Sequence, residues 1–267
     1  MCLRCNAVLY KICATLKFPA GDKYAMAGNF RVLRSGFCRS GVNSGILQRF
    51  SLCLQNKNVF LMLQIENLSL KYGDQQILKN VSLTVMPGEM ACVCGESGCG
   101  KSSLLKAVLG FVDADGYIAV CGEVLSPLTV YSIRKNIAYV PQELALPAET
   151  VEEMVRMPFE LKANKHVPYS YDLLMEEWKW LGLEPGLLNK YTNEISGGQR
   201  QRIMLGVSGM LRKPLLLADE PTSALDGDSA HHVLDYFRML ADKRGMAVAV
   251  VSHARELVDG CDKVLRL

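Results

Sequence analysis

Apolar residues from position 62 onward recur in two kinds of pattern, and each kind predicts a different element. Residues 63–70 alternate apolar and polar side chains, which predicts a half-exposed, edge-type strand, and this β segment continues to residue 85 with a turn at Gly73-Asp74. Continuous apolar runs of strand length predict buried strands instead. The further strands predicted in this way, together with a last strand, cover residues 90–94, 136–140, 215–218, 246–252 and 263–267.

Helix-length segments lie between these predicted strands. An amphipathic helix is predicted at residues 171–181, inside an insertion that covers residues 143–193. Another helix opens near residue 196, and a third covers residues 228–243. Because strands and helices alternate along the chain, the sequence predicts an α/β fold with a largely parallel core.

The first 61 residues differ from the rest in pattern and in charge. They show no sustained periodicity and hold nine Lys and Arg residues against one acid, Asp22, whereas residues 62–267 hold 21 basic and 26 acidic residues. Three interpretations remain open: a start site assigned too far upstream, so that Met62 is the first residue; an unstructured basic tail; or an organellar transit peptide. We favour the first, with residues 62–267 as the folded domain.

Composition limits the class of protein further. No run of 18 or more apolar residues occurs, so no membrane-spanning helix is predicted. The cysteines after residue 61 lie mostly in predicted strands or in a glycine-rich loop, where a reduced thiol behaves as a small apolar group, and this usage favours a cytosolic compartment. Neither Cys2-x-x-Cys5 nor Cys92-x-Cys94 has a second pair or a histidine at ligand spacing, so we expect no cysteine-bound metal.

A phosphate-binding loop follows the predicted strand at residues 90–94. The sequence Gly95-Glu96-Ser97-Gly98-Cys99-Gly100-Lys101-Ser102 fits the pattern G-x-x-x-x-G-K-[ST] and continues into a helical run that begins at Ser103. Its glycines allow backbone N–H groups to surround phosphate oxygens, and the helix amino terminus adds a partial positive charge. We expect Lys101 to reach the β- and γ-phosphates and Ser102 to bind Mg²⁺. The pattern therefore predicts a nucleotide site that includes Ser103.

Two adjacent carboxylates end the buried strand at residues 215–218. Because ligands of α/β proteins bind at the carboxyl edge of the sheet, we expect Asp219 and Glu220 to lie beside the phosphate loop. Asp219 can bind Mg²⁺ through water. Strand alternation sends Glu220 in a different direction from Asp219, so Glu220 can orient and deprotonate the attacking water.

A second anion site is predicted where a helix opens after Ile195. A hydroxyl and two glycines, from Ser196, Gly197 and Gly198, stand at the amino terminus of this helix and are followed by Gln199. The run resembles the signature motif of the ATP-binding cassette (ABC) ATPases, with Ile195 where the family usually has leucine. This resemblance implies that the second site covers the γ-phosphate of an ATP bound by another subunit.

Other motifs of this family occur in the same order over residues 62–267. The matching residues are the adenine-stacking Tyr72, the Q-loop Gln142, the D-loop at residues 223–226 with Asp226, and the switch His253. The resemblance implies that Gln142 senses Mg²⁺ and the γ-phosphate, and that His253 holds the γ-phosphate and the water in line with Glu220. Glu220, His253 and Lys101 are then the catalytic residues, which act by positioning and electrostatics.

The resemblance implies the ATP-hydrolysing subunit of an ABC transporter. Its fold would be a P-loop NTPase core with a largely parallel sheet, an N-terminal antiparallel β subdomain and an inserted α-helical subdomain at about residues 143–210. Two copies would bind ATP and Mg²⁺ head to tail, and a transmembrane permease would hold them at the cytoplasmic face of the plasma membrane. The apolar residues that could form either the groove for the permease or a locally packed loop core are Leu144, Leu146, Pro147, Met154 and Pro158.

One alternative is a soluble ABC ATPase with a regulatory or nucleic-acid-associated role. The 53 residues between Gln142 and Ser196 are too few for a long coiled coil, and the sequence has no second P-loop. The net acidic charge of residues 62–267 disfavours a nucleic-acid partner. Residues 149–159 and 252–264 resemble the iron-export (FetA-like, YbbL-like) subgroup, which favours metal export, but the substrate would contact the permease and is not predicted further.

Overall fold

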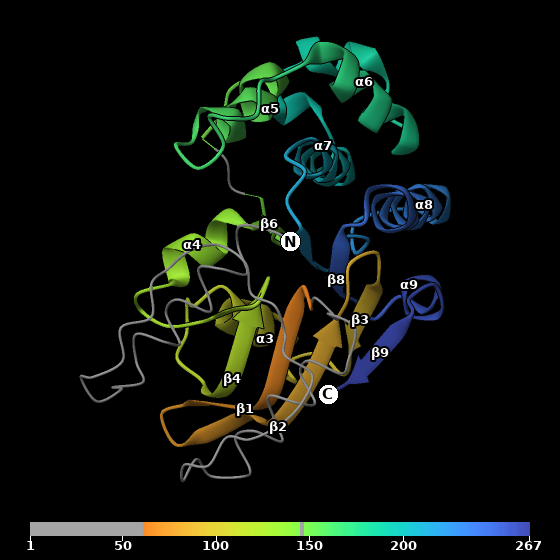
Figure 1. Ribbon diagram of the computed structural model, residues 1–267. Helices are drawn as coiled ribbons and strands as arrows, with labels where there is room; N and C mark the ends of the chain where they lie inside the picture. The colour runs from red at the N-terminus through yellow and green to blue at the C-terminus, as the bar shows by residue number, and fades with distance from the viewer. Residues whose placement is uncertain (1–60, 145–146) are drawn as a thin grey trace, which may run out of the picture. The chain divides into compact units, whose positions relative to one another are not determined.

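The computed structural model describes residues 61–144 and 147–267, which form two β-sheets covered by helices (Figure 1). The expectations of a basic extension and of a start at Met62 concern residues 1–61, of which all but Leu61 lie outside the described part of the chain. Leu146, one of the predicted permease contacts, also lies outside it.

The first sheet is antiparallel, and its strands follow the order β2-β1-β4-β5. The alternation predicted for β1 is confirmed, because its apolar residues Leu63, Ile65, Leu68 and Leu70 are at most 1% exposed. The predicted turn is also confirmed, since Gly73 has a left-handed φ of 57° between β1 and β2. The strands are β1 (Leu63–Tyr72), β2 (Gln75–Val85), β4 (Asp115–Val120) and β5 (Glu123–Val124).

Strands β4 and β5 are missing from the elements predicted from sequence. β4 lies beside β1, with Leu63 opposite Val120 and Ile65 opposite Ile118. These partners are far apart along the chain and β5 has only two residues, so local periodicity carries little signal for this pairing. The expectation that β1 is an edge strand was wrong for the same reason, because β4 covers its second side.

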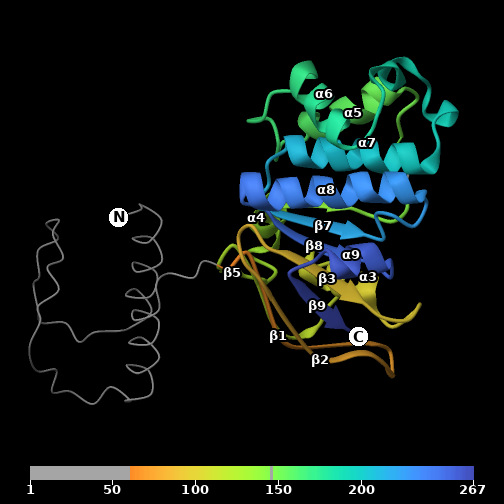
Figure 2. The ribbon, with the colours of Figure 1, turned by 90° about the vertical axis from the view of Figure 1, so that its right-hand side faces the viewer.

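The second sheet is parallel throughout, in the order β6-β7-β8-β3-β9 (Figures 1 and 2). The prediction of buried strands from apolar runs is confirmed, because every residue of β3, β7 and β8 is buried. The strands are β3 (Met90–Cys94), β6 (Ile137–Val140), β7 (Leu215–Asp219), β8 (Ala247–Val251) and β9 (Lys263–Arg266). Since all of them run the same way, their carboxyl ends meet at one edge.

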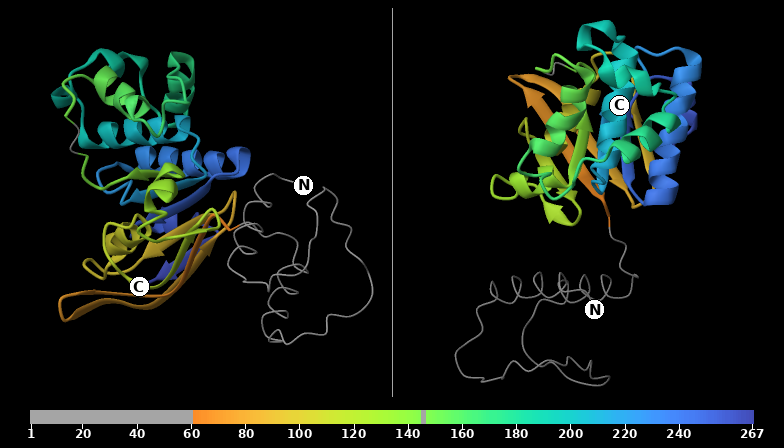
Figure 3. Two further views of the ribbon diagram at one scale, coloured as in Figure 1. Left: turned by 60° about the vertical axis from the view of Figure 1, so that its left-hand side comes forward. Right: turned by 90° about the horizontal axis from the view of Figure 1, so that it is seen from above.

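Alternate residues of the parallel sheet face two different cores. Leu215 and Leu217 of β7 pack with the antiparallel sheet and with helix α3, whereas Leu216 and Ala218 pack toward helices α7 and α8. Figures 2 and 3 show α7 and α8 running along that side of the sheet. The predicted α/β class is therefore confirmed. The helices around the sheet are α3 (Lys101–Val108), α4 (Val130–Lys135), α7 (Gly197–Met210), α8 (Gly227–Arg244) and α9 (Arg255–Asp259).

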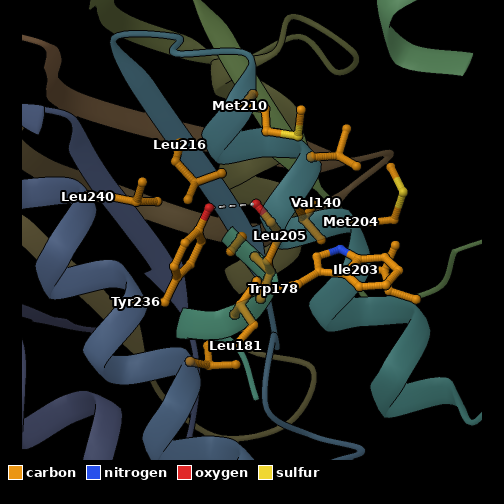
Figure 4. Packing of buried hydrophobic residues seen from close by; sticks show 14 of the residues in the cluster. Val140, Trp178, Leu181, Ile203, Met204, Leu205, Met210, Leu216, Tyr236 and Leu240 are labelled. Carbon is orange, nitrogen blue, oxygen red and sulfur yellow. Dashed lines mark hydrogen bonds between the residues drawn. The ribbon is translucent and has the colours of Figure 1, made fainter. Parts of the chain in front are cut away.

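The inserted segment is helical, as predicted. Its helices are α5 (Val151–Glu160) and α6 (Tyr171–Trp180), followed by 3-10 turns at Pro185–Asn189 and Thr192–Glu194. Trp178 of α6 is fully buried and packs near Leu181, Ile203 and Leu205 in the core that the insertion shares with α8 (Figure 4). The bounds of this segment as a separate subdomain remain a prediction.

One of the residues that could form a permease groove, Met154, belongs to this core instead, and Leu144 lies partly buried against it. Met154 is 1% exposed, and Leu144 packs against the same buried cluster. The reason is the period of α5, which turns Met154 inward together with Val151 and Val155. Among the described residues, no helix is long and apolar enough to span a bilayer.

A buried ion pair joins the insertion to α8. Glu177 of α6 is 2% exposed, and its carboxylate lies 2.7 Å from Arg244 and accepts a hydrogen bond from the Tyr236 hydroxyl at 2.6 Å. The same hydroxyl lies 3.4 Å from the carbonyl of Leu205 on α7 (Figure 4). A Cβ on Gly209 would overlap the Tyr236 hydroxyl, so glycine is needed there. These contacts fix α6, α7 and α8 to one another.

Candidate ATP-binding site

Most of the predicted site residues lie at the edge where the parallel strands end. β3 leads into the loop at Gly95, β6 precedes Gln142, β7 ends at Asp219 and β8 precedes His253. A cavity of about 680 Å³ opens at this edge. It is lined by the P-loop residues other than Cys99, by Ile77 and by the further predicted residues Tyr72, Ser103, Gln142, Glu220 and His253.

The glycine loop closes tightly over the start of α3. Gly100 caps this helix with a φ of 101°, and a Cβ there would lie 2.7 Å from Ile77, so glycine is needed for both conformation and space. Lys101 is 8% exposed, and its ammonium donates to the carbonyls of Gly95 at 3.0 Å and Glu96 at 2.9 Å. The loop therefore holds a positive charge beside its own backbone.

Cys99 is the predicted loop residue whose side chain lies elsewhere. It lines a separate cavity of about 490 Å³ together with residues of β2 and β9. The Cys99 side chain is therefore directed away from the nucleotide cavity, and only its backbone belongs to the loop.

Two oxygen ligands for a divalent cation lie side by side near the loop. The Ser102 hydroxyl donates to Asp219 Oδ1 at 3.1 Å, and Asp219 is 4% exposed. Burial raises the pKa of Asp219; the hydrogen bond from Ser102 opposes this shift and the charge of Glu220 adds to it. A cation bound here would relieve the burial of the carboxylate charge.

The type and number of these donors fit Mg²⁺. Hard oxygen donors suit this ion, which takes few ligands from the protein and keeps water and phosphate oxygens. Gln142 lines the same cavity and could supply a further oxygen. Residues 61–144 and 147–267 hold no group of three or more His, Cys, Asp or Glu side chains that could form an all-protein cage.

Glu220 directly follows β7 and is held through its backbone. Its φ is 48°, its N–H donates to the Val251 carbonyl at 2.8 Å, and its carbonyl accepts from Ser223 Oγ at 3.0 Å. The Glu220 carboxylate lies 3.1 Å from His253 Nδ1, so the two predicted catalytic side chains are in contact. Our reason for the direction of Glu220 was wrong: the strand ends at Asp219, and the left-handed backbone, not strand alternation, directs the side chain.

Gln201 is a contact of Glu220 that the sequence prediction missed. It lies on α7, is 3% exposed, and its side-chain amide donates to the Glu220 carbonyl at 3.1 Å. The available signal was its spacing, because Gln201 shares a helix face with Met204, Leu205 and Ser208, which are all buried. A buried glutamine on such a face needs a hydrogen-bond partner.

The predicted second anion site lies apart from this cavity. Ser196 and Gln199 form a capping box at the start of α7, with hydrogen bonds of 3.1 and 2.9 Å. A Cβ on Gly197 would touch nothing within 4 Å, whereas one on Gly198 would lie 2.6 Å from Leu225 of the D-loop. None of these four signature residues lines the P-loop cavity. Ser196 and Gly197 are exposed, so this helix end is open to another molecule.

Asp226, the last residue of the D-loop, caps helix α8. Its Oδ1 accepts a hydrogen bond from the Ser229 N–H at 2.8 Å, and this bond lowers the pKa of Asp226. Asp226 does not line the P-loop cavity. Any contribution to nucleotide binding would therefore have to arise at a contact with another chain.

This geometry defines a nucleotide hydrolase of the P-loop class. One sheet edge brings together a glycine loop with a buried lysine, a serine–aspartate pair and a carboxylate in contact with a histidine. Residues 78–223 match the family described as ABC transporter, and the chain belongs to this family. It is an ATP-binding subunit whose hydrolysis of ATP is coupled to transport.

Three similar proteins illustrate the range of the family. The Escherichia coli K12 protein "Probable iron export ATP-binding protein FetA" is 31% identical over 207 residues, which are 77% of this chain and 91% of that protein. The Haemophilus influenzae "Probable ABC transporter ATP-binding/permease protein" is 33% identical over 76% of this chain, which spans 37% of that longer protein. The solved dimer of the ATP-binding cassette MJ0796 bound to ADP and Pi has a TM-score of 0.66 and 27% identity, covering 77% of this chain and 94% of that one.

Proposed function

We propose that two copies of this chain assemble head to tail, with each ATP enclosed by the P-loop of one copy and residues 196–199 of the other. The observation that carries this proposal is the separation, within one chain, of two phosphate-binding features: the P-loop cavity and the exposed start of α7. The solved MJ0796 cassette, which is dimeric, supports the pairing. A transmembrane permease would hold the pair at the cytoplasmic face of the plasma membrane. The Haemophilus relative supports this partner, because its name gives it both an ATP-binding and a permease function.

ATP would enter the cavity with its adenine against Tyr72. This side chain is 46% exposed, and its hydroxyl lies 3.4 Å from Ser103 at the start of α3, so its ring is free to stack. The N–H groups of the loop and Lys101 would bind the β- and γ-phosphates. Ser102, Asp219 and Gln142 would hold Mg²⁺, which neutralises phosphate charge when it is bound.

Glu220 would accept a proton from the attacking water. Its carboxylate is buried and contacts His253, whose side chain is 70% exposed and therefore able to reach a phosphate in the cavity. His253 would then hold the γ-phosphate and the water in line with Glu220. Donors from the second copy would stabilise the charge that develops on the γ-phosphate.

Replacing Ser196 with Arg tests the shared site. We expect the variant to bind ATP as a single chain with nearly unchanged affinity, because Ser196 does not line that chain's own cavity. Hydrolysis should fall at least about a hundredfold, since a donor to the transition state is lost and a bulky side chain blocks the partner. Calorimetric titration with ATP and steady-state phosphate release measure the two effects separately.

Ser170→Arg is the matched control, because Ser170 also caps a helix, α6, by accepting from a backbone N–H. Both variants lose a cap worth about 1 kcal/mol, but only Ser196→Arg should lose turnover. If Ser196→Arg weakened ATP binding by the single chain as strongly as a P-loop variant does, the signature would belong to the same chain's pocket and the shared site would be excluded.

Gln201 is proposed to position Glu220. Gln201→Met keeps the length of the side chain but removes its N–H donor to the Glu220 carbonyl. We expect kcat to fall about tenfold with little change in KM for ATP. A small displacement of the base slows the chemical step but leaves the binding of ATP unchanged. Ser208→Ala is the control, since Ser208 is equally buried on α7 but bonds only to Met204. Equal kcat for both variants would contradict the positioning role.

Metal export, with iron as the first candidate, is the transport reaction that we propose. The support is the likeness to FetA along nearly all of that protein. The residues of the proposed ATP site would contact nucleotide rather than the transported metal, so the permease would select the metal.

A further inference from the structure

A basic cavity lies at the opposite edge of the parallel sheet from the ATP site. Its volume is about 350 Å³, and it opens at the amino ends of β6 and β7, where Asn136 and Pro214 precede the strands. The charged or titratable residues that line it are Lys135, Lys162, His166, Arg212 and Lys213. Neither Asp nor Glu occurs among its described lining residues, although residues 62–267 hold more acids than bases.

Lys213 is the unusual member of this group. It is 6% exposed, and no hydrogen bond or ion pair joins its ammonium to any residue in the described part of the chain. Burial lowers the pKa of the Lys213 ammonium, and the charge of Lys135 lowers it further. Residues 1–60, 145 and 146 contain a single acid, Asp22, so the rest of the sequence offers at most one counter-charge.

Other buried charges of the described residues all have partners. Glu177 is paired with Arg244, Lys101 with two loop carbonyls, Asp219 with Ser102 and Glu220 with His253. The Lys213 ammonium is not among the described polar atoms that are both fully buried and without a partner, but partial loss of hydration beside another cation still disfavours its charge. An anion in the cavity would offset the unfavourable surroundings of the Lys213 charge.

Lys213 borders the space that such a ligand would occupy. Lys213 and Arg212 line both this cavity and a neighbouring one of about 510 Å³, so the two side chains stand between two solvent-accessible spaces. Lys135 packs its ammonium 4.4 Å from the Tyr131 ring, which restrains it beside the cavity. Several cations around one small volume suit an anion that carries more than one negative charge.

We propose that this cavity binds a phosphate group through Lys213, with Arg212, Lys135 and Lys162 around it. The group could belong to a phospholipid head or to a small soluble phosphate, because both present the same oxygens to the cations. This second site is separate from the ATP site: β6 and β7 run between them, with the ATP site beyond their carboxyl ends. The proposal does not depend on how ATP is shared between two copies.

The first test measures thermal unfolding of the full chain during titration with inorganic phosphate. The protein is first saturated with Mg²⁺ and a non-hydrolysable ATP analogue, so that phosphate cannot enter the P-loop site, and potassium chloride of equal ionic strength serves as the reference. We expect phosphate to raise Tm of the wild-type chain more than chloride does. For Lys213→Met, the apparent phosphate Kd should rise at least about tenfold, the loss expected for one charged hydrogen bond.

The controls separate binding from folding. Lys190→Met removes an exposed lysine outside the cavity and should respond to phosphate as the wild type does. In chloride alone, Lys213→Met should be at least as stable as the wild type, because the substitution removes a partly desolvated charge that is repelled by Lys135. If Lys213→Met is less stable than the wild type by the same amount at every phosphate concentration, Lys213 is structural and the proposal is wrong.

A second measurement distinguishes the sources of phosphate. The same proteins are sedimented with phosphatidylcholine vesicles that do or do not contain phosphatidic acid. Lys213-dependent binding to the acidic vesicles assigns the site to a lipid head, whereas Lys213-dependent stabilisation by inorganic phosphate without vesicle binding assigns it to a soluble ligand. Absence of both effects overturns the proposal.

Discussion

Replacing Glu220 with Gln is expected to lower ATP hydrolysis at least about a hundredfold, the usual loss when a general base is removed. The substitution preserves the shape of the side chain. It also preserves the backbone contacts of residue 220 with Val251, Gln201 and Ser223, which involve only the main chain of Glu220. The variant therefore removes the proton acceptor and alters the contact with His253, but leaves the backbone of residue 220 in place. Phosphate release at saturating ATP measures the loss.

In the proposed pair, the same variant should bind ATP and remain closed, because separation of the two copies would follow hydrolysis. Light scattering with and without ATP would show a dimer that persists only when nucleotide is present. Glu160→Gln, an exposed residue at the end of α5, should hydrolyse ATP like the wild type and return to the monomer. Brisk hydrolysis by Glu220→Gln would show that another group removes the proton from water.

Replacing Lys101 with Ala is expected to weaken ATP binding roughly ten- to hundredfold, which corresponds to about 1.5–3 kcal/mol for a lost hydrogen bond to a charged group. Lys101 is buried, and two loop carbonyls hold its ammonium next to the glycine backbone. Its charge is therefore positioned before the phosphates arrive, and little side-chain entropy is lost on binding. Titration of each variant with a fluorescent ATP analogue measures the affinity.

Lys79→Ala is the control for this experiment, because Lys79 is exposed on β2 and outside the ATP cavity. It should bind ATP like the wild type. An unchanged affinity of Lys101→Ala would mean that the backbone N–H groups alone retain the phosphates, and the role assigned to the lysine would have to be abandoned.

The buried strands that carry the site were predictable from sequence for a physical reason. Strands such as β7 and β8 can be recognised in the sequence as apolar runs, because both faces of a parallel sheet are buried. Once those strands are known, their carboxyl ends must share one edge, which brings Gln142, Glu220 and His253 to the P-loop. Sheet geometry explains why these residues meet, but Gln142 and His253 were chosen as site residues from their match to the family motifs, because local pattern does not distinguish them from ordinary loop and surface residues.

Other features depend on contacts that no local pattern contains. The pairing of β4 with β1 joins distant segments, and the left-handed backbone of Glu220 follows from bonds to Val251 and Ser223 rather than from strand periodicity. Met154 appeared free to meet a permease, but the packing of α5 places it in the core. Nothing in the local sequence distinguishes Lys213 from an exposed surface lysine, and only the structure shows that it is buried.

The close approach of Gly198 to Leu225 has a consequence for the proposed pair of subunits. The signature and the D-loop of one copy pack without space for a methyl group, and the D-loop serine Ser223 bonds to the Glu220 carbonyl. In the proposed pair, the group that would meet the partner's ATP is thus connected to the base that would act on the chain's own ATP by a short, tightly packed stretch of backbone. Binding of ATP at one site would then change catalysis at the other site. The rate of ATP hydrolysis would depend on ATP bound at both sites of the pair rather than at one site alone.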